Sequence, residues 1–291
     1  MEPLKMVEFV YRKSSPVGSV FQSHPNYEIF YFHEGKGNYL IGDKIHVLAP
    51  GDLLIMHGMT LHCPNVRNDE HFKYVRSLIN FEPDYVRKAV QHLFTVNVLE
   101  PFEELKNYKI NLQAEDREQF EAALQTMQRF HSRSDEVSMN RFRVAFIDLL
   151  FMVFQFFKKP IEQKEELTSQ KEIHVQELIR FIEEHYTEDL HLEQLEKSMH
   201  VNKYYLSRIF REVTGVTIIN YLYQRRINQA KMIFLMEEKR RTVTEIGYGL
   251  GFKHVTHFSR VFRQYVGDTP EQFRKRIKKS ISVHSGSESG Q

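Results

Sequence analysis

Three glycines at alternate positions, Gly247, Gly249 and Gly251, precede a segment with a helical pattern, KHVTHFSRVFRQYVG. This spacing is compatible with a phosphate-binding loop, in which backbone amides at a helix N-terminus hold a nucleotide. Such a loop follows a β-strand, however, and the preceding TVTEIGY has the pattern of a short amphipathic helix. We therefore interpret the glycines as the bend between two packed helices, where absent side chains permit close approach and positive φ.

The same helix-turn-helix pattern occurs twice in the C-terminal part. LSRIFREVTGVT (206–217) and FSRVFRQYVGDT (258–269) share Ser, Arg, Phe, Arg, Gly and Thr, and both keep apolar residues at helical spacing. The predicted buried stripes are Leu206, Ile209, Phe210 and Val213 in the first unit, and Phe258, Val261, Phe262 and Tyr265 in the second. A purely structural interpretation, with solvated arginines, is disfavoured because both faces are duplicated together.

The opposite faces of both helices are basic and can form hydrogen bonds, as a helix in the major groove requires. The predicted DNA-contacting residues are Lys203, Tyr204, Ser207, Arg208, Arg211, Val255, Thr256, Ser259, Arg260 and Arg263. Arg208 and Arg260 are the candidates for a guanine edge, and Arg211 and Arg263 are candidates for phosphate. The helix predicted between the units has roughly 19 residues and spans about 29 Å, close to the ~34 Å between successive major-groove faces.

The charge distribution agrees with a polyanionic partner. Residues 1–170 contain 20 Lys and Arg against 23 Asp and Glu, whereas residues 198–279 contain 17 against 6. The total of +2 therefore hides a strongly basic C-terminal third. Such a bias is typical of nucleic-acid binding, although a solvated charged face is the alternative.

Length and composition predict a globular protein of two domains, since 291 residues with 41% hydrophobic content can form two cores. The single Cys63 excludes an internal disulfide framework. The N-terminus has no apolar signal region, and the run Val144–Phe157 is shorter than a membrane span, so we expect a cytoplasmic protein without a membrane partner.

Turn residues divide the chain into regions of different character. Short apolar segments between Val20 and Asn80 alternate with Gly, Pro and Asp, which predicts a small antiparallel β-sandwich or barrel. Two helices at 116–130 and 139–160 should then form a hairpin, and helices should dominate from residue 174. The fold class is therefore α+β, with domains at 1–165 and 174–279, a linker at 166–173 and a disordered tail at 280–291.

The paired units resemble the DNA-binding domain of AraC/XylS-type bacterial transcription regulators. The resemblance covers about 174–278 and includes the glycine-aromatic turn, the FSRVFR helix and the ending GDTPEQFR. Glu196 and Gly247 stand where the family usually has Ala, and Lys253 and His254 replace a usual Ser or Asp helix cap. The missing cap weakens the second recognition helix by about 1 kcal/mol.

The segment 24–62 resembles the cupin-like effector domain that commonly precedes this DNA-binding unit. Against the metal-binding cupin motifs, His24, Glu28 and His62 align, and Asn26 replaces a second His. The resemblance suggests His24, Asn26, Glu28, Tyr39 and His62 as effector-binding residues. Two imidazoles, a carboxylate and an amide could hold a divalent metal, and could equally hydrogen-bond a sugar or a small acid. We expect an organic effector, without a metal, a cofactor or catalytic residues.

The resulting hypothesis is a regulator controlled by a small molecule, possibly a sugar, that binds double-stranded promoter DNA. The resemblance implies activation through RNA polymerase and a homodimer formed by the helical hairpin, although the hairpin could pack only on its own barrel. A metal-dependent cupin enzyme with a nucleic-acid-binding appendage is the alternative from another class. A constitutive DNA-binding protein, with a barrel filled by side chains, is a third.

Overall fold

The computed structural model describes residues 6–14, 21–67, 73–158, 169–236 and 241–285. The chain divides into two compact units, Met1–Thr168 and Ser169–Gln291, in agreement with an α+β protein of two domains. Among the helices described, none has an apolar stretch long enough to cross a bilayer.

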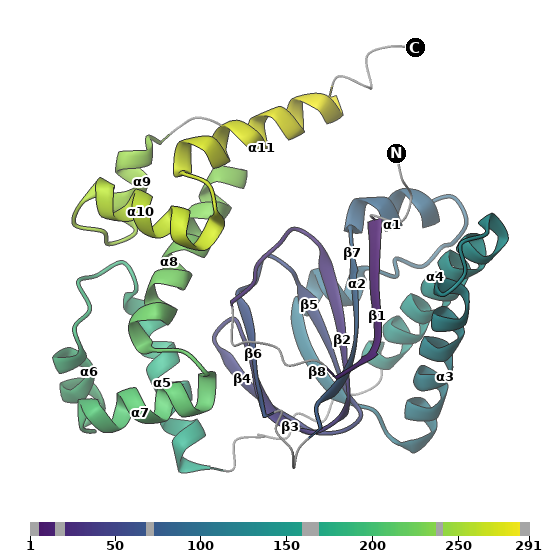
Figure 1. The fold of residues 1–291 in the computed structure, drawn as a ribbon, viewed down its shortest axis with the longest axis horizontal. Coiled ribbons are helices and arrows are strands. Elements are labelled where there is room, and N and C mark those ends of the chain that lie inside the picture. Colours follow the sequence, from purple (N-terminus) through teal and green to yellow (C-terminus); the bar gives the residue numbers. More distant parts are fainter. Residues whose placement is uncertain (1–5, 15–20, 68–72, 159–168, 237–240, 286–291) are drawn as a thin grey trace. The chain divides into compact units, whose positions relative to one another are not determined.

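The first unit is built on two antiparallel sheets (Figure 1). One sheet has the strand order β1-β7-β2-β5-β8, and the other has the order β4-β3-β6. The strands are β1 (Val7–Lys13), β2 (Tyr27–Glu34), β3 (Lys36–Ile41), β4 (Lys44–Leu48), β5 (Asp52–His57), β6 (His62–Arg67), β7 (Val75–Phe81) and β8 (Asn107–Asn111). This arrangement confirms the β-domain expected from the turn residues.

Alternation along β2 explains why nearly the whole strand is buried. Ile29 and Tyr31 belong to the cluster that the sheet forms with the helices, whereas Phe30 and Phe32 belong to the cluster between the two sheets. Successive side chains of a strand point to opposite faces, so both faces of this strand are covered. Tyr39 of β3 packs against Phe30 at 4.9 Å between ring centroids, which places these aromatic side chains inside the barrel.

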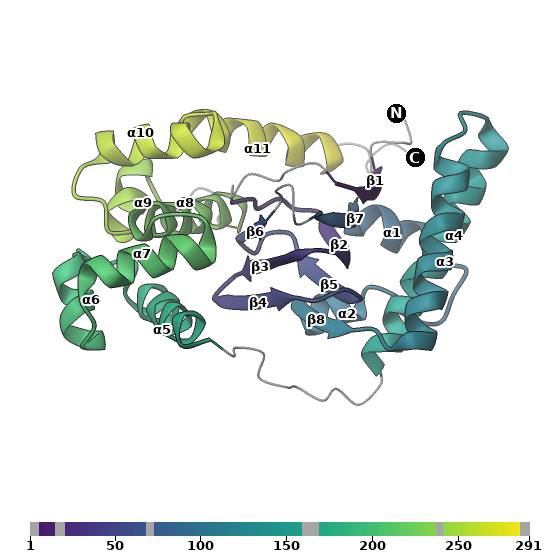
Figure 2. The same ribbon diagram turned by 60° about the horizontal axis from the view of Figure 1, so that its bottom comes forward.

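Four helices complete the first unit: α1 (Pro83–Val90), α2 (Glu100–Glu104), α3 (Ala114–His131) and α4 (Glu136–Lys158). The predicted hairpin is present as α3 and α4, which lie side by side in Figure 2. Their apolar faces, including Phe120 and Phe146, share one core with the five-stranded sheet. The hairpin therefore covers the barrel, and only the residues on its outer face are available to a partner.

Two strands lie outside the region Val20–Asn80 in which the sequence patterns predicted the β-domain: β1, which precedes it, and a strand in the part where helix was favoured from Asp84 onward. The segment Asn107–Asn111 pairs with β5 as the edge strand β8. It has only five residues, and none of them is fully buried. The hydrophobic alternation that identifies a half-buried strand is therefore weak here. Lys109 anchors the strand through a 3.0 Å ion pair with the buried Asp52.

The second unit is entirely helical. Its helices are α5 (Gln170–His185), α6 (Leu192–Met199), α7 (Lys203–Thr214), α8 (Ile218–Met236), α9 (Val243–Gly249), α10 (Val255–Val266) and α11 (Pro270–Ser285). Figure 1 shows α7 and α10 near opposite ends of α8. The two helix-turn-helix units predicted from the repeat are therefore α6–α7 and α9–α10, with α8 between them.

Two expected boundaries differ from the structure. Helix α5 begins at Gln170, inside the segment assigned to the linker, because Ser169 accepts a hydrogen bond from the backbone amide of Glu172 and caps the helix. Helix α11 continues through Ser285, so the beginning of the tail at 280 is helical rather than disordered. The remainder of the expected tail, 286–291, lies outside the described residues, as do linker residues 166–168.

Candidate DNA-binding surface and ligand-binding barrel

The first recognition helix, α7, buries the stripe that its periodicity predicted. Leu206, Ile209, Phe210 and Val213 are all buried. Asn202 caps the helix, since its side-chain oxygen accepts hydrogen bonds from the backbone amides of Tyr204 and Tyr205. The helix ends at a left-handed Gly215, as a C-terminal cap commonly does. Local chemistry therefore fixes both ends of α7.

The outward face of α7 divides into exposed and engaged residues. Tyr204 is 76% exposed, and Arg208 and Arg211 are also exposed. The Arg208 guanidinium lies 5.5 Å from the Tyr205 ring centroid, which limits where its fork points. Lys203 instead forms a 2.5 Å ion pair with Glu193 of α6. Ser207, which was also predicted on this face, is half-buried.

The glycine turn of the second unit connects α9 to α10 without a preceding β-strand, which excludes the nucleotide loop. A Cβ on Gly247 would meet the Phe258 ring at 3.0 Å, so its absence lets the two helices approach. Gly251 has φ of +83°, and a Cβ there would meet the Thr187 carbonyl oxygen at 2.5 Å. The predicted close approach is therefore present at Gly247 and Gly251, and the predicted positive φ is present at Gly251. A Cβ on Gly249, in contrast, would have no neighbour within 4 Å.

The second recognition helix, α10, buries Phe258, Val261 and Phe262 as predicted. The fourth predicted member of this stripe, Tyr265, is only half-buried, and its hydroxyl donates a 3.2 Å hydrogen bond to Asn220 at the start of α8. The N-cap residue His254 makes no side-chain capping bond, in contrast to Asn202 in the first unit. The absent cap expected from the sequence is therefore confirmed.

The outward face of α10 carries three exposed side chains, Thr256, Arg260 and Arg263, with Ser259 half-buried beside them. Val255, which the sequence also placed on this face, is half-buried and packs against the apolar core of the second unit. This position is the first turn of the helix, where side chains point back toward the preceding turn. Val255 thus faces the core more than the helical wheel alone indicated.

The sequence did not identify two neighbours of these arginines. Gln264 and Thr269 line an open hollow together with Ser259, Arg260 and Arg263. Gln264 is exposed and lies one turn after Arg260, so helical spacing could have placed it on this face. Thr269 belongs to the turn before α11, and its position depends on the fold. Amide and hydroxyl groups beside arginines add hydrogen-bonding capacity toward bases or phosphates.

A buried arginine on α8 connects the segment after α5 to the second helix-turn-helix unit. Arg226 donates hydrogen bonds to three backbone carbonyls, those of Tyr186 at 2.6 Å, Glu188 at 2.7 Å and Gly251 at 3.0 Å. Burial lowers the pKa of this guanidinium, and the three acceptors offset the loss of water. Arg226 therefore joins the segment after α5 to the turn of the second unit.

In the first unit, four of the five predicted effector-binding side chains converge within the barrel. Glu28 is only 2% exposed, and its Oε2 lies 3.4 Å from His24 Nε2 and 3.8 Å from His62 Nε2. The Tyr39 hydroxyl donates to Glu28 Oε1 at 3.4 Å, and burial, with the Glu28 charge, raises the Tyr39 pKa well above its usual value. The fifth residue, Asn26, contributes its backbone carbonyl, which accepts from His24 Nδ1 at 3.2 Å.

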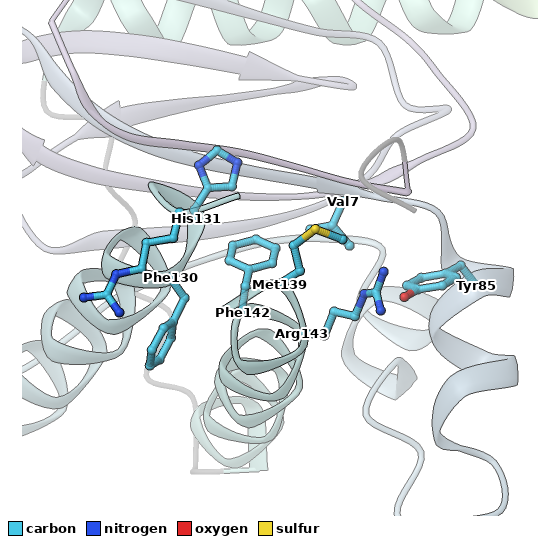
Figure 3. Close-up of a pocket in the computed structure, with 8 residues that line it drawn as sticks. Val7, Tyr85, Phe130, His131, Met139, Phe142 and Arg143 are labelled. Carbon is cyan, nitrogen blue, oxygen red and sulfur yellow. The ribbon is translucent and has the colours of Figure 1, made fainter. Parts of the chain in front are cut away.

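A second concave site lies outside the barrel, and the sequence did not suggest it. Its lining comes from β1, α1 and the tip of the α3–α4 hairpin: Val7, Tyr85, Phe130, His131, Arg133, Met139, Phe142 and Arg143. Figure 3 shows Arg143 extending toward Tyr85 at one side, with Phe142 and Met139 beside Val7. The His131 ring packs on Phe9 and Phe142, so much of this wall belongs to the apolar core.

Comparisons with known proteins match both units. Residues 15–139 match the family described as AraC-like ligand binding domain, and residues 195–276 match a helix-turn-helix domain family. The chain is similar to the regulatory protein SoxS of Escherichia coli strain K12, with 36% identity over 103 residues that cover 35% of this chain and 94% of SoxS. The similarity therefore includes nearly all of a much shorter regulator.

Proteins longer than SoxS are also similar to this chain. The Msm operon regulatory protein of Streptococcus mutans is 29% identical over 119 residues, which are 41% of this chain and only 42% of that protein. The structure of ToxT from Vibrio cholerae O395 aligns over 94% of this chain and 98% of ToxT, with 15% identity and a TM-score of 0.35. The domain matches and the full-length similarity to SoxS show that the chain belongs to the AraC family of helix-turn-helix transcription regulators, with an AraC-like ligand-binding domain before its DNA-binding domain.

Proposed function

We propose that this protein controls transcription by placing α7 and α10 in successive major grooves of promoter DNA. The observation that carries the proposal is the division of both helices into a buried apolar stripe and an outward face with two exposed arginines each. Arg208 and Arg260 contact base edges, because a guanidinium fork matches the two acceptors of guanine. Arg211 and Arg263, three residues further along each helix, neutralise phosphates and set the register.

Helix α8 supports this arrangement. Its 19 residues span about 29 Å at the usual rise of 1.5 Å per residue, close to the ~34 Å repeat of B-DNA. Arg226 and the Tyr265–Asn220 hydrogen bond hold the second unit to this helix. A fixed separation reduces the entropy that the second unit would lose on docking, so the two units should bind as one.

The effector of this regulator is a small polar metabolite, such as a sugar, that enters the barrel beside Glu28. Buried apolar side chains, including Phe30, Phe32 and Leu54, fill the space between the sheets, so room for a ligand must come from the polar end with Tyr39 and His62. We infer a ligand with hydroxyl donors, since Glu28 presents a buried carboxylate. Its binding shifts the population between DNA-binding geometries of the protein.

The remaining parts of the proposal concern partners. The outer face of the α3–α4 hairpin carries exposed apolar residues, and we infer that a second copy of the chain covers it to form a homodimer. The protein acts in the cytoplasm, where it activates transcription through contact with RNA polymerase. We further infer that it has no catalytic activity, since SoxS and the Msm operon regulator are described as regulators.

Selection of bound duplexes from a random DNA library by the full-length chain tests the function. The expected result is an enriched sequence that binds at least about 10³-fold more tightly than random DNA at the same salt. A variant with both Arg208→Ala and Arg260→Ala should select no such sequence, while it still retains its fold by circular dichroism. Enrichment of the same sequence by the variant, or of none by the natural chain, would contradict the proposal.

A further inference from the structure

The barrel contains a set of polar groups whose chemistry is more specific than a general ligand pocket. His24 and His62 both direct Nε2 at the same carboxylate oxygen of Glu28. One ligand atom from each of these three residues lies within 4.8 Å of the other two. Glu28 and His62 are almost fully buried. The three side chains therefore converge on a space of atomic size.

Hydrogen bonds to backbone carbonyls fix the orientation of both rings. His24 Nδ1 lies 3.2 Å from the Asn26 carbonyl oxygen, and His62 Nδ1 lies 2.9 Å from that of Thr60. A carbonyl can only accept, so Nδ1 is the donor in each ring. In the neutral ring, Nε2 then carries a lone pair directed at a carboxylate. This pattern, with Nδ1 bound to a carbonyl and Nε2 directed inward, is how proteins orient a metal-binding histidine.

The His24 ring nitrogen that faces Glu28 is the polar atom of this cluster on which the argument rests. His24 Nε2 is buried and has no hydrogen-bond partner among the residues that the structure describes. His24 Nε2 lies 3.4 Å from Glu28 Oε2, but the two atoms do not form a hydrogen bond. A cation bound to both atoms would make this close approach favourable. A buried carboxylate without a compensating charge costs several kcal/mol. A divalent cation held by these atoms would supply that compensation.

The surrounding backbone holds the three groups in place. The Tyr39 hydroxyl donates to Glu28 Oε1, the oxygen that is not shared with the histidines. His24 is held by a hydrogen bond from its backbone amide to the Gly58 carbonyl at 2.8 Å. A Cβ on Gly58 would lie 1.7 Å from the Asn26 carbonyl oxygen and 2.5 Å from His24 Nδ1, so only glycine permits this approach. Such outer support is typical of a pre-organised metal site.

We propose that the N-terminal unit binds one divalent transition-metal ion through Nε2 of His24, Nε2 of His62 and Oε2 of Glu28. Two ligands of a tetrahedral zinc ion are separated by roughly 3.4 Å, and the two imidazole-to-carboxylate distances are 3.4 and 3.8 Å. Two imidazoles and one carboxylate favour zinc, cobalt or nickel over magnesium or calcium, which prefer oxygen ligands. The ion would lie beside the organic effector proposed above.

The ligand set leaves at least one coordination position open, as in sites where three protein residues hold zinc and a water or ligand completes the shell. A small molecule with a hydroxyl or carboxylate group could occupy that position. The ion could thus belong to the sensing function. Binding of the metal does not depend on DNA recognition, which resides in the second unit.

Titration of the chelator-treated full-length chain with Co²⁺, followed by visible absorption, tests the site. The expected result is the ligand-field spectrum of a four- or five-coordinate ion at one equivalent per chain, and its loss when Zn²⁺ competes. Glu28→Gln and His24→Ala should each weaken binding by at least about 10-fold, the effect of losing even an outer partner of a metal ligand. His92→Ala, which removes an exposed histidine outside the site, should leave the titration unchanged.

Two results would overturn the proposal. The first is cobalt binding that both Glu28→Gln and His24→Ala leave intact, which would assign the ion to another place. The second is the absence of detectable cobalt binding by the natural chain, which would leave the three side chains without a metal-binding role. DNA binding by Glu28→Gln without metal, expected to be retained, separates failure of this proposal from failure of the DNA-binding function.

Discussion

The guanidinium of Arg226 donates a hydrogen bond to the Gly251 carbonyl at 3.0 Å, across 25 residues of sequence. The same side chain bonds two carbonyls in the segment after α5, and it lies 5.4 Å from the Phe252 ring centroid. Gly251 can be in this position only because it has no side chain, since a Cβ would lie 2.7 Å from Arg226 Nη2. The turn of the second unit and the middle of α8 are therefore one rigid joint.

Replacement of Arg226 by Met should destabilise the DNA-binding domain by about 3 kcal/mol, because three partly buried carbonyls would each lose a donor at about 1 kcal/mol. Urea unfolding monitored by circular dichroism measures the change. Arg211→Met is the matched control, since this arginine is exposed and its loss should stay within about 0.5 kcal/mol. Equal stabilities of the two variants would show that Arg226 does not hold the joint.

Arg208 and Arg263 should differ in the kind of DNA affinity they provide. Arg208→Ala should cost about 1–3 kcal/mol at the selected sequence and relax the base preference at one position. Arg263→Ala should weaken binding to all sequences alike and reduce the salt slope by about 1. Affinities measured at several salt concentrations, on the selected and on random duplexes, separate the two effects. A sequence-specific loss for Arg263→Ala would argue against its phosphate role.

Val144 on α4 should lie in the homodimer contact. Its side chain is 69% exposed, and Val137, one heptad earlier on the same helix, is 68% exposed, whereas Phe142 and Phe146 are buried in the core. Val144→Asp places a charge in the proposed interface without disturbing that core, so sedimentation should show a shift from dimer to monomer with the thermal midpoint of the isolated protomer retained. Asp148→Asn is the control. A dimer that persists in the Val144 variant would place the interface elsewhere.

The stability of the first unit should depend on the titration of His33. Burial, with the nearby Arg12 guanidinium, lowers the pKa of His33 to about 4 in the folded chain, against about 6.5 when unfolded. Between these values the unfolded chain binds more protons, so the free energy of unfolding rises with pH. The stabilisation is present above pH ~6.5 and is lost as the pH falls toward ~4, by up to about 3 kcal/mol.

Urea unfolding at pH 7.5, 6 and 5 should show a smaller pH dependence for His33→Gln than for the natural chain. The comparison is needed because burial also lowers the pKa of His46 to about 4, so the natural chain alone does not isolate His33. Gln can retain a hydrogen bond to Ser77, which lies 2.8 Å from His33 Nε2. The same pH dependence in both chains would show that His33 is not the titrating group.

Local patterns predicted most of the DNA-binding domain. The stripe from Leu206 to Val213 is recognisable because helical periodicity and burial have the same period, and His254 is visibly a poor cap. The contact of Val255 with the core was not predicted, because a helical wheel does not include the backward tilt of side chains in the first turn. The sequence also did not identify the role of Arg226, since its acceptors are carbonyls that any residue carries.

The barrel was less predictable than the helices. The sequence predicted that Phe30 and Tyr39 are aromatic residues on strands. It did not predict which face of the sheet they occupy, because that depends on how the two sheets pack together. Resemblance brought together His24, Glu28 and His62, and the structure adds that the carbonyls of Asn26 and Thr60 fix both rings. Backbone acceptors of this kind do not appear in any side-chain motif. For the same reason, Asn26 looked like a replaced ligand although it contributes through its main chain.

The central claim, that one chain reads two successive grooves on the same side of DNA, is tested most directly by changing the spacing within the selected site. Insertion of 5 base pairs between the two half-sites moves one to the opposite face, and 10–10.5 base pairs correspond to one helical turn. The account predicts that the 5-base-pair insertion reduces affinity to that of a single half-site, with two hydroxyl-radical footprints one turn apart on the original site. Unchanged affinity after the insertion, or a single footprint, would contradict it.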